Sequence, residues 1–146
     1  DLAGGVVGDL RAVLLGGAAG SFVMPDQLDL ALTFEATRAA GVSLGSGVVM
    51  AIDTATDMAG MLARIAAFMR AESCGQCVPC RIGTVRQQEA LARLARRAPI
   101  GSRAREIALL GDLAQVMGDA SICGLGHTAA SAVQSAIRLG LLERDR

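Results

Sequence analysis

Three cysteines stand close together in the chain, each separated by two residues, at Cys74, Cys77 and Cys80. A C-x2-C-x2-C run can direct three thiolates at one point, and iron–sulfur clusters use such runs together with a fourth ligand from elsewhere in the chain. The remaining cysteine, Cys123, follows in the stretch Ser-Ile-Cys-Gly-Leu-Gly. The four cysteines therefore predict an all-cysteine site for a single 4Fe–4S cluster.

A structural zinc site is the alternative interpretation of the same four residues. Structural zinc sites usually combine two separate C-x2-C pairs or include histidine, and three evenly spaced cysteines are unusual in them. The spacing favours an iron–sulfur cluster. The competing hypothesis is a non-catalytic structural or assembly module whose four-cysteine site holds zinc or stays empty.

No group of residues in the sequence indicates acid–base or nucleophilic catalysis. His127 is the single histidine, so no pair or triad with a second base can be drawn from it. It follows Cys123 by four residues, where we expect a hydrogen bond to the cluster region rather than ligation. We therefore predict no catalytic residue in this chain.

The cysteine run also carries a family resemblance. The stretch from Glu72 to Gly83 reads E-S-C-G-x-C-x-P-C-R-x-G, and it resembles the cluster signature of the NADH-binding flavoprotein subunit of respiratory complex I. Related NAD-dependent formate dehydrogenases and NAD-linked hydrogenases share this subunit type. In that family the fourth ligand follows in an I-C-x-L-G context, which Cys123 matches.

The resemblance implies that this chain relays electrons within an NADH:acceptor oxidoreductase or a formate dehydrogenase. Electrons would pass between FMN and downstream iron–sulfur centres through this cluster. FMN and NAD would bind in an upstream domain whose glycine motif has no match here, so the chain alone should not be active. The implied partners are a 2Fe–2S thioredoxin-like subunit and a larger iron–sulfur subunit. Since the chain begins at Asp1 without Met, we expect it to be a piece of a larger subunit.

Composition sets outer limits on the function. The 14 Lys plus Arg residues balance the 14 Asp plus Glu residues, so the chain has no net charge that would indicate a nucleic-acid partner. The longest uncharged run, residues 120–137, is interrupted by glycines and His127 and does not indicate a membrane span. Cysteines at ligand spacing favour a reducing compartment. We expect a bacterial cytoplasmic protein, within a larger complex at the cytoplasmic face of the membrane.

The sequence predicts an α+β fold in two parts, with residues 1–53 as the first. Apolar runs predict strands at residues 10–15, 22–24 and 48–52, the last being the strongest, and a short helix at residues 34–40. The glycine-rich residues 16–20 between the first two strands indicate a hairpin connection rather than a phosphate-binding loop. This pattern suggests a β-grasp (ubiquitin-like) module, and it matches the soluble-ligand-binding β-grasp domain of the family, for which we expect a spacer role.

Residues 54–146 form the second predicted part, a helical domain that binds the 4Fe–4S cluster. Apolar residues, three methionines among them, recur at helical spacing after a Thr54-x-x-Asp57 capping pattern, and they indicate core packing. Further helices are predicted at residues 82–97, from a cap at Ser102 to Gly118, and from a cap at Thr128 to Gly140. These helices make a four-helix bundle. Its cysteine loops would meet at one end, and the two predicted parts would fold as two small units.

The predicted cluster needs positive potential around it, because it is a buried anion. The start of the helix after Cys80 offers backbone N–H groups, and Arg81 and Arg86 lie close in sequence. For Arg81 a solvated surface position is the alternative. Pro79 should stiffen the loop between two ligands.

Overall fold

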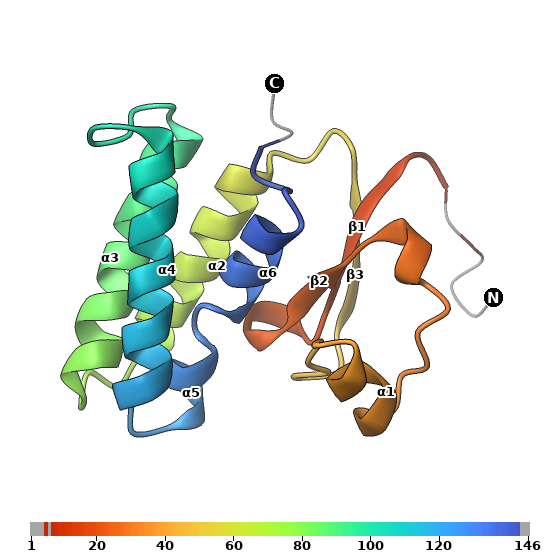
Figure 1. Cartoon of the computed structure of the whole chain (residues 1–146), viewed down its shortest axis with the longest axis horizontal. Coiled ribbons are helices and arrows are strands. Elements are labelled where there is room, and N and C mark those ends of the chain that lie inside the picture. The colour runs from red at the N-terminus through yellow and green to blue at the C-terminus, as the bar shows by residue number, and fades with distance from the viewer. Residues whose placement is uncertain (1–4, 6, 144–146) are drawn as a thin grey trace.

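The computed structural model describes residues 5 and 7–143, and the predictions for Asp1 and the last three residues lie outside this part (Figure 1). The chain is a mixed α and β protein with a small sheet followed by helices, so the α+β class is confirmed. In chain order the elements are β1 (Leu10–Leu15), 3-10 helix η1 (Gly17–Ala19), β2 (Ser21–Val23), 3-10 helix η2 (Pro25–Gln27), α1 (Phe34–Ala39), β3 (Val49–Asp53), α2 (Met58–Glu72), α3 (Val78–Ala95), α4 (Arg103–Ala120), α5 (Gly124–Thr128) and α6 (Ser131–Arg138).

The sheet is antiparallel, with strand order β2-β1-β3. In the register of the central strand, Val13 lies opposite Val23 of β2 and Ala51 of β3. Residues 16–20 connect β1 to β2 through η1, as predicted for a hairpin. Alternating side chains of β1 are buried on both faces of the sheet, because one face packs on the helices and the other on residues such as Val42.

The strand β3 is less buried than its apolar sequence suggests. Val49 and Met50 are 59% and 43% exposed, and Ile52 is the buried residue of the strand. β3 lies at one edge of the sheet, but β2 lies at the other edge and is buried beside α6, so edge position alone does not account for this exposure. Hydrophobicity predicted the strand correctly but could not predict which strand lies in the middle.

The N-cap residue of α2 is Asp57, three residues after Thr54, where the predicted capping pattern begins. The Asp57 side chain accepts a hydrogen bond from the Gly60 N–H group at 2.9 Å. Asp is among the strongest N-cap residues, so it replaces Thr54 in that role. The methionines Met58, Met61 and Met69 are buried, which confirms their core role, whereas Phe68 is 52% exposed.

Three predicted helix boundaries are wrong. The helix α3 begins at Val78 rather than residue 82, because Pro79 lies in its first turn, where proline needs no backbone donor. Gly118 lies inside α4 instead of ending it. The stretch after Cys123, predicted as a loop, is the short helix α5, and α6 begins at Ser131. The predicted cap at Ser102 is confirmed, since its side chain accepts from the Arg105 N–H group.

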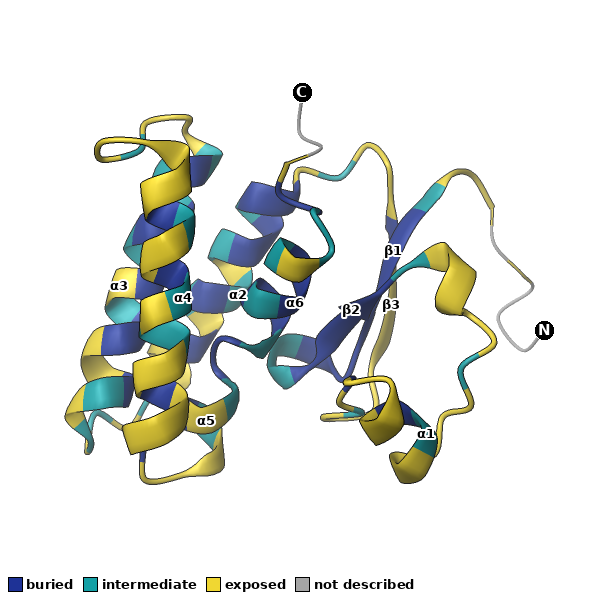
Figure 2. Cartoon of the chain, viewed as in Figure 1, coloured by how far each residue is buried: buried dark blue, intermediate teal, exposed yellow. Residues whose placement is uncertain are grey.

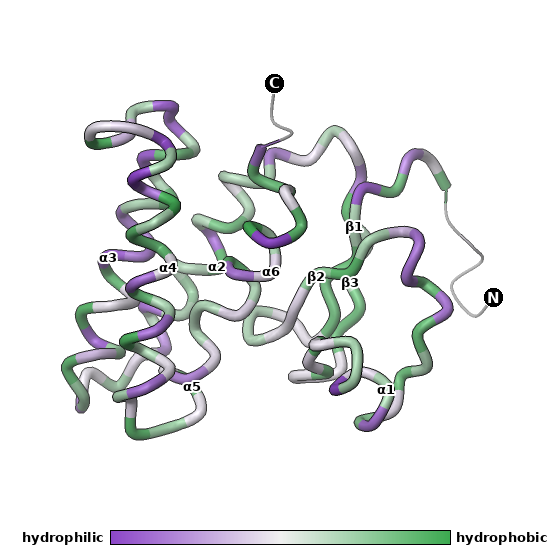
Figure 3. The backbone as a smooth tube through the Cα atoms, in the orientation of Figure 1, coloured by the Kyte–Doolittle hydropathy of each residue, from purple (hydrophilic) through white to green (hydrophobic). Residues whose placement is uncertain are grey.

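The sheet and the helices share one hydrophobic core. Its largest cluster joins sheet residues such as Leu14 and Phe22 to residues of α2, α3, α4 and α6. The Phe22 N–H group also donates to Ser135 Oγ of α6 at 2.9 Å. Figure 2 shows β1 and β2 as buried and much of α4 as exposed, and Figure 3 shows polar and apolar residues alternating along α3 and α4. The division at residue 53 stays a prediction, and the core crosses it.

Among the described helices, none combines the length and the apolar character that crossing a bilayer requires.

Candidate functional site

All four cysteines line one cavity of about 240 Å³, at the end of the helices where α2 ends and α3 begins. Cys80 is buried, Cys77 is half-buried, and Cys74 and Cys123 are exposed free thiols. The structure therefore brings together the four residues that the spacing singled out. The complete lining consists of Glu72, Ser73, Cys74, Gln76, Cys77, Cys80, Ile122, Cys123 and Leu125.

Two helices begin at this cavity. Cys77 is the N-cap residue of α3, and Cys123 is the N-cap residue of α5. The first N–H groups of a helix have no partner within the helix and carry a partial positive charge. Cys77 and Cys123 thus lie beside backbone N–H groups that have no partner within their own helices.

Backbone N–H groups lower the pKa of the Cys77 thiol. The N–H group of Ile122 lowers the pKa of the Cys77 thiol below its ordinary value, and the N–H group of Cys80 acts in the same direction against the opposing effect of desolvation. Ile122 precedes Cys123, so the cause lies on the segment that supplies the distant cysteine. The thiolate, which is the form that binds metals, is favoured here.

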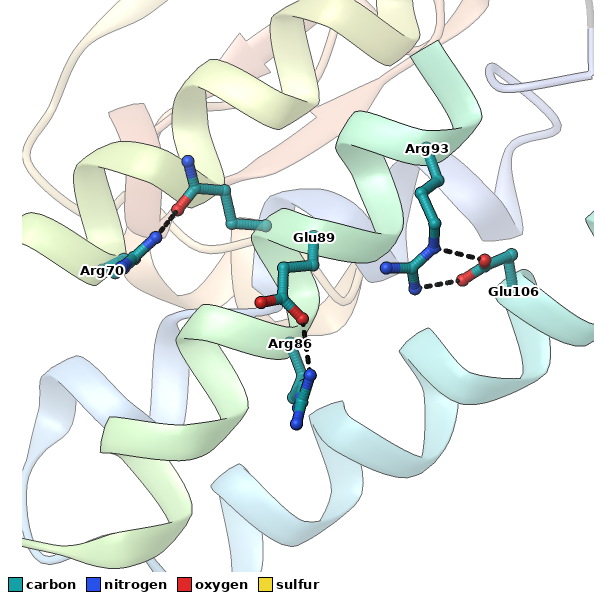
Figure 4. A network of polar contacts seen from close by, with 6 residues as sticks. Arg70, Arg86, Glu89, Arg93 and Glu106 are labelled. Atoms are coloured by element: carbon teal, nitrogen blue, oxygen red, sulfur yellow. Dashed lines mark hydrogen bonds and ion pairs between the residues drawn. The ribbon is translucent and has the colours of Figure 1, made fainter. Parts of the chain in front are cut away.

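The exposed side chain of Arg81 hydrogen-bonds to the backbone of the cysteine loop. Arg81 Nη1 donates to the Gly75 carbonyl oxygen at 2.8 Å. Gly75 has φ of +75°, which side chains other than glycine rarely adopt, so the loop depends on glycine there. Arg86 instead pairs at the surface with Glu89 at 2.8 Å (Figure 4). Neither Arg81 nor Arg86 lines the cavity.

A glycine allows α5 to approach the cysteines closely. A Cβ atom on Gly126 would lie 2.3 Å from Ser121 Oγ and 3.2 Å from Cys80 Cβ. The buried Ser121 hydroxyl also acts on the Cys77 thiol, whose pKa it helps to lower. The His127 ring contacts the backbone of Ser121, with His127 Nε2 lying 2.7 Å from the Ser121 carbonyl oxygen. His127 does not line the cavity.

The last glycine of the cysteine run, Gly83, lets α3 pack against α4. A Cβ atom there would lie 2.5 Å from Met117 Cγ and 2.6 Å from Met117 Sδ, and Met117 is fully buried. The sequence stretch from Glu72 to Gly83 ends on this glycine, but the sequence alone does not explain why a glycine is needed there. The structure supplies the reason, because a side chain would separate the two helices next to the site.

We expect Gly83→Ala to lower the free energy of unfolding by about 1–3 kcal/mol, the usual cost of overpacking a core. Gly118→Ala is the matched control, since nothing lies within 4 Å of a Cβ atom at that exposed helical position. It should be neutral or stabilising by up to about 1 kcal/mol. Urea denaturation of both variants measures the difference, and equal stability of the two would contradict the packing argument.

Five of the nine residues that line the cavity are not cysteines. In the described part of the chain, no three His, Cys, Asp or Glu side chains form a group that could hold one metal ion. The rest of the lining, which the cysteine spacing did not indicate, consists of Glu72, Ser73, Gln76, Ile122 and Leu125. Ser73 directly precedes Cys74, so its place beside the cysteine run was visible in the sequence. The contact of Ser73 with Cys80 was not visible in the sequence.

Comparisons with known proteins agree with this geometry. Residues 60–139 match the family model described as the NADH-ubiquinone oxidoreductase-F iron-sulfur binding region, which is more than half of the chain. The chain belongs to this family. The matched region contains all four cysteines, and the resemblance drawn from the cysteine run is confirmed.

Curated relatives carry related names. The F subunit of the NADH-quinone oxidoreductase of Rickettsia typhi is 34% identical over 139 residues, which are 93% of this chain and 32% of the relative. The corresponding protein of Rickettsia bellii (strain OSU 85-389) is 34% identical over 140 residues, 93% of this chain and 33% of the relative. The chain thus spans about a third of the length of these relatives.

A solved structure shares the fold. An NAD+-reducing NiFe hydrogenase in its H2-reduced state superposes with a TM-score of 0.78 at 29% identity, over 95% of this chain and 24% of the hydrogenase chain. The relatives are named as NADH-quinone oxidoreductase subunits, and the solved structure is named as an NAD+-reducing hydrogenase. The family description itself specifies an iron–sulfur binding region.

Proposed function

We propose that this chain holds one 4Fe–4S cluster through Cys74, Cys77, Cys80 and Cys123 and relays electrons in the flavoprotein subunit of an NADH dehydrogenase of the complex I type. The observation that carries the proposal is that all four thiols line one cavity. A cluster bound by four thiolates accepts and releases one electron at a time. The chain's own contribution is to place the thiolates, supply N–H groups and shield Cys80 from water.

The cavity suits a cluster better than a zinc ion. Four thiolates around tetrahedral zinc, at a Zn–S distance of about 2.3 Å, lie only about 3.8 Å apart and leave no space between them. Here the four cysteines line a cavity of about 240 Å³ together with five other residues. The Ser121 hydroxyl helps to lower the pKa of the Cys77 thiol, which favours the thiolate that a cluster needs. Gly126 lets α5 pack directly against Ser121 and Cys80, beside the cavity.

The larger setting of the chain is also part of the proposal. FMN and NAD would bind in a preceding domain of the full subunit, and electrons would pass from FMN through this cluster to further iron–sulfur centres. The partners would be a 2Fe–2S thioredoxin-like subunit and a larger iron–sulfur subunit, in a complex at the cytoplasmic face of a bacterial membrane. An NAD-dependent formate dehydrogenase or an NAD-linked hydrogenase would use the chain in the same way.

The fold suits this role. We propose that residues 1–53, with the three-stranded sheet and α1, are a β-grasp module. Residues 54–146 would be the cluster-binding domain, with α2, α3, α4 and α6 as a four-helix bundle. The helices α2 and α3 deliver three cysteines, and the connection from α4 to α5 delivers the fourth.

Iron and sulfide analysis of the whole protein, purified without oxygen, tests the proposal. We expect four irons and four sulfides per chain from the proposed cluster, together with a low-temperature EPR signal that appears on reduction. Stoichiometric zinc without iron would instead support the structural or assembly module. A protein that takes up neither metal under anaerobic reconstitution would also contradict the electron-relay function.

A further inference from the structure

Ser73 links the end of α2 to the most buried of the four thiols. Its Oγ lies 3.3 Å from Cys80 Sγ, and it also accepts a hydrogen bond from the Gly75 N–H group at 3.3 Å. Ser73 is the C-cap residue of α2, and Cys80 is 5% exposed. One hydroxyl group therefore contacts both the cysteine loop and a candidate ligand.

The chemistry of the two partners fixes the direction of this contact. A thiolate carries no proton, so Cys80 in its ligand form can only accept. The Gly75 N–H group can only donate, and it uses a lone pair of the Ser73 oxygen. The Ser73 O–H hydrogen is left for the Cys80 sulfur.

We propose that Ser73 is a positioning residue that raises the reduction potential of the cluster by donating its hydroxyl hydrogen to Cys80 Sγ. The proposal rests on the proposed function. Reduction adds one electron from the donor to the cluster and its thiolates, with no bond made or broken and the proton remaining on the Ser73 oxygen. A hydrogen bond to sulfur is stronger when the sulfur carries more negative charge, so Ser73 stabilises the reduced state more than the oxidised state.

Burial makes this hydrogen bond effective. Cys80 lies in the first turn of α3 and is largely shielded from water, so a protein donor is not replaced by solvent. Cys74 and Cys123 are exposed, and water can donate to their sulfur atoms. Of the four thiols, that of Cys80 is thus the best shielded from solvent donors.

The test is a redox titration of the cluster in the whole protein, followed by EPR, for wild type, Ser73→Ala and Ser73→Thr. We expect Ser73→Ala to lower the reduced-to-oxidised ratio at a fixed potential about tenfold, which corresponds to a fall of about 59 mV in the midpoint potential of a one-electron couple. Ser73→Thr keeps the hydroxyl, and the extended backbone at this residue accommodates threonine. It should restore most of the shift.

Ser43→Ala is the matched control. The Ser43 side chain accepts from the Gly45 N–H group at 3.1 Å, the same local contact that Ser73 makes to Gly75, but Ser43 is exposed and does not line the cysteine cavity. Its removal should leave the midpoint potential unchanged. If Ser73→Ala carries a full cluster at the wild-type potential, Ser73 only orders the loop and the inference is wrong. A wild-type protein without any cluster would instead overturn the proposed function itself.

Discussion

Replacing Cys123 with alanine is expected to abolish the EPR signal of the reduced protein and to reduce its iron content from a full cluster to background. Cys123 is the only cysteine outside the run at residues 74–80, and it lines the same cavity as the other three. Without it the site has three thiolates and one open position. Iron analysis and EPR of the anaerobically purified whole protein measure the loss.

The Cys123 variant should also melt at a lower temperature than wild type. A bound cluster would connect the residue before α5 to the loop between α2 and α3, and metal binding to a site that forms only in the folded chain adds to folding stability. Thr128→Ala is the control, because Thr128 lies at the other end of α5 and bonds only locally, to the Gly124 carbonyl oxygen at 2.8 Å. A Cys123 variant that keeps a four-iron cluster would show that the ligand set is wrong.

The candidate site was predictable because its signal is local. The spacing of Cys74, Cys77 and Cys80 is written in the sequence, and the structure adds that Cys123 reaches the same cavity. The helix starts were harder. The sequence suggests a loop position for Pro79, whereas it occupies the first turn of α3, because proline suits both positions.

Contacts between distant segments account for most of what the sequence could not predict. The clash that keeps Gly83 a glycine comes from Met117 on α4, and no pattern near Gly83 indicates that partner. The edge position of β3 depends in the same way on the pairing order of the strands. The hydrogen bond from Ser73 to Cys80 spans seven residues across a loop, whose path follows from glycine at position 75.

A buried ion pair was equally hard to predict, although both of its residues are visible in the sequence. The position of Arg93 near the end of its helix indicates only a favourable charge there. In the structure it makes two hydrogen bonds to Glu106 of α4, at 2.6 and 2.8 Å (Figure 4). Glu106 is 2% exposed and also accepts from the Ile100 N–H group at 2.8 Å. The pair therefore fixes the turn between α3 and α4.

Replacing Glu106 with glutamine is expected to lower the free energy of unfolding at pH 7 by about 2–4 kcal/mol. Breaking a buried pair typically costs about 3–5 kcal/mol, and water reduces the cost here, since the Arg93 side chain is 20% exposed. Glu89→Gln is the matched control, because the Arg86–Glu89 pair is 62% and 42% exposed. It should change stability by no more than about 0.5 kcal/mol.

Acid should remove the same contribution from the wild-type protein. The hydrogen bonds from Arg93 hold the pKa of the Glu106 carboxyl below its ordinary value, so the unfolded chain takes up this proton first as the pH falls. The stability due to the pair is complete above the pKa of glutamate in the unfolded chain, about 4.3, and is lost as the pH falls through the lower pKa of the folded state. Urea denaturation of wild type and Glu106→Gln between pH 7 and about pH 3 should show their difference in stability shrinking. A difference that stays constant over this range would mean that packing of the side chain, and not its charge, stabilises the turn.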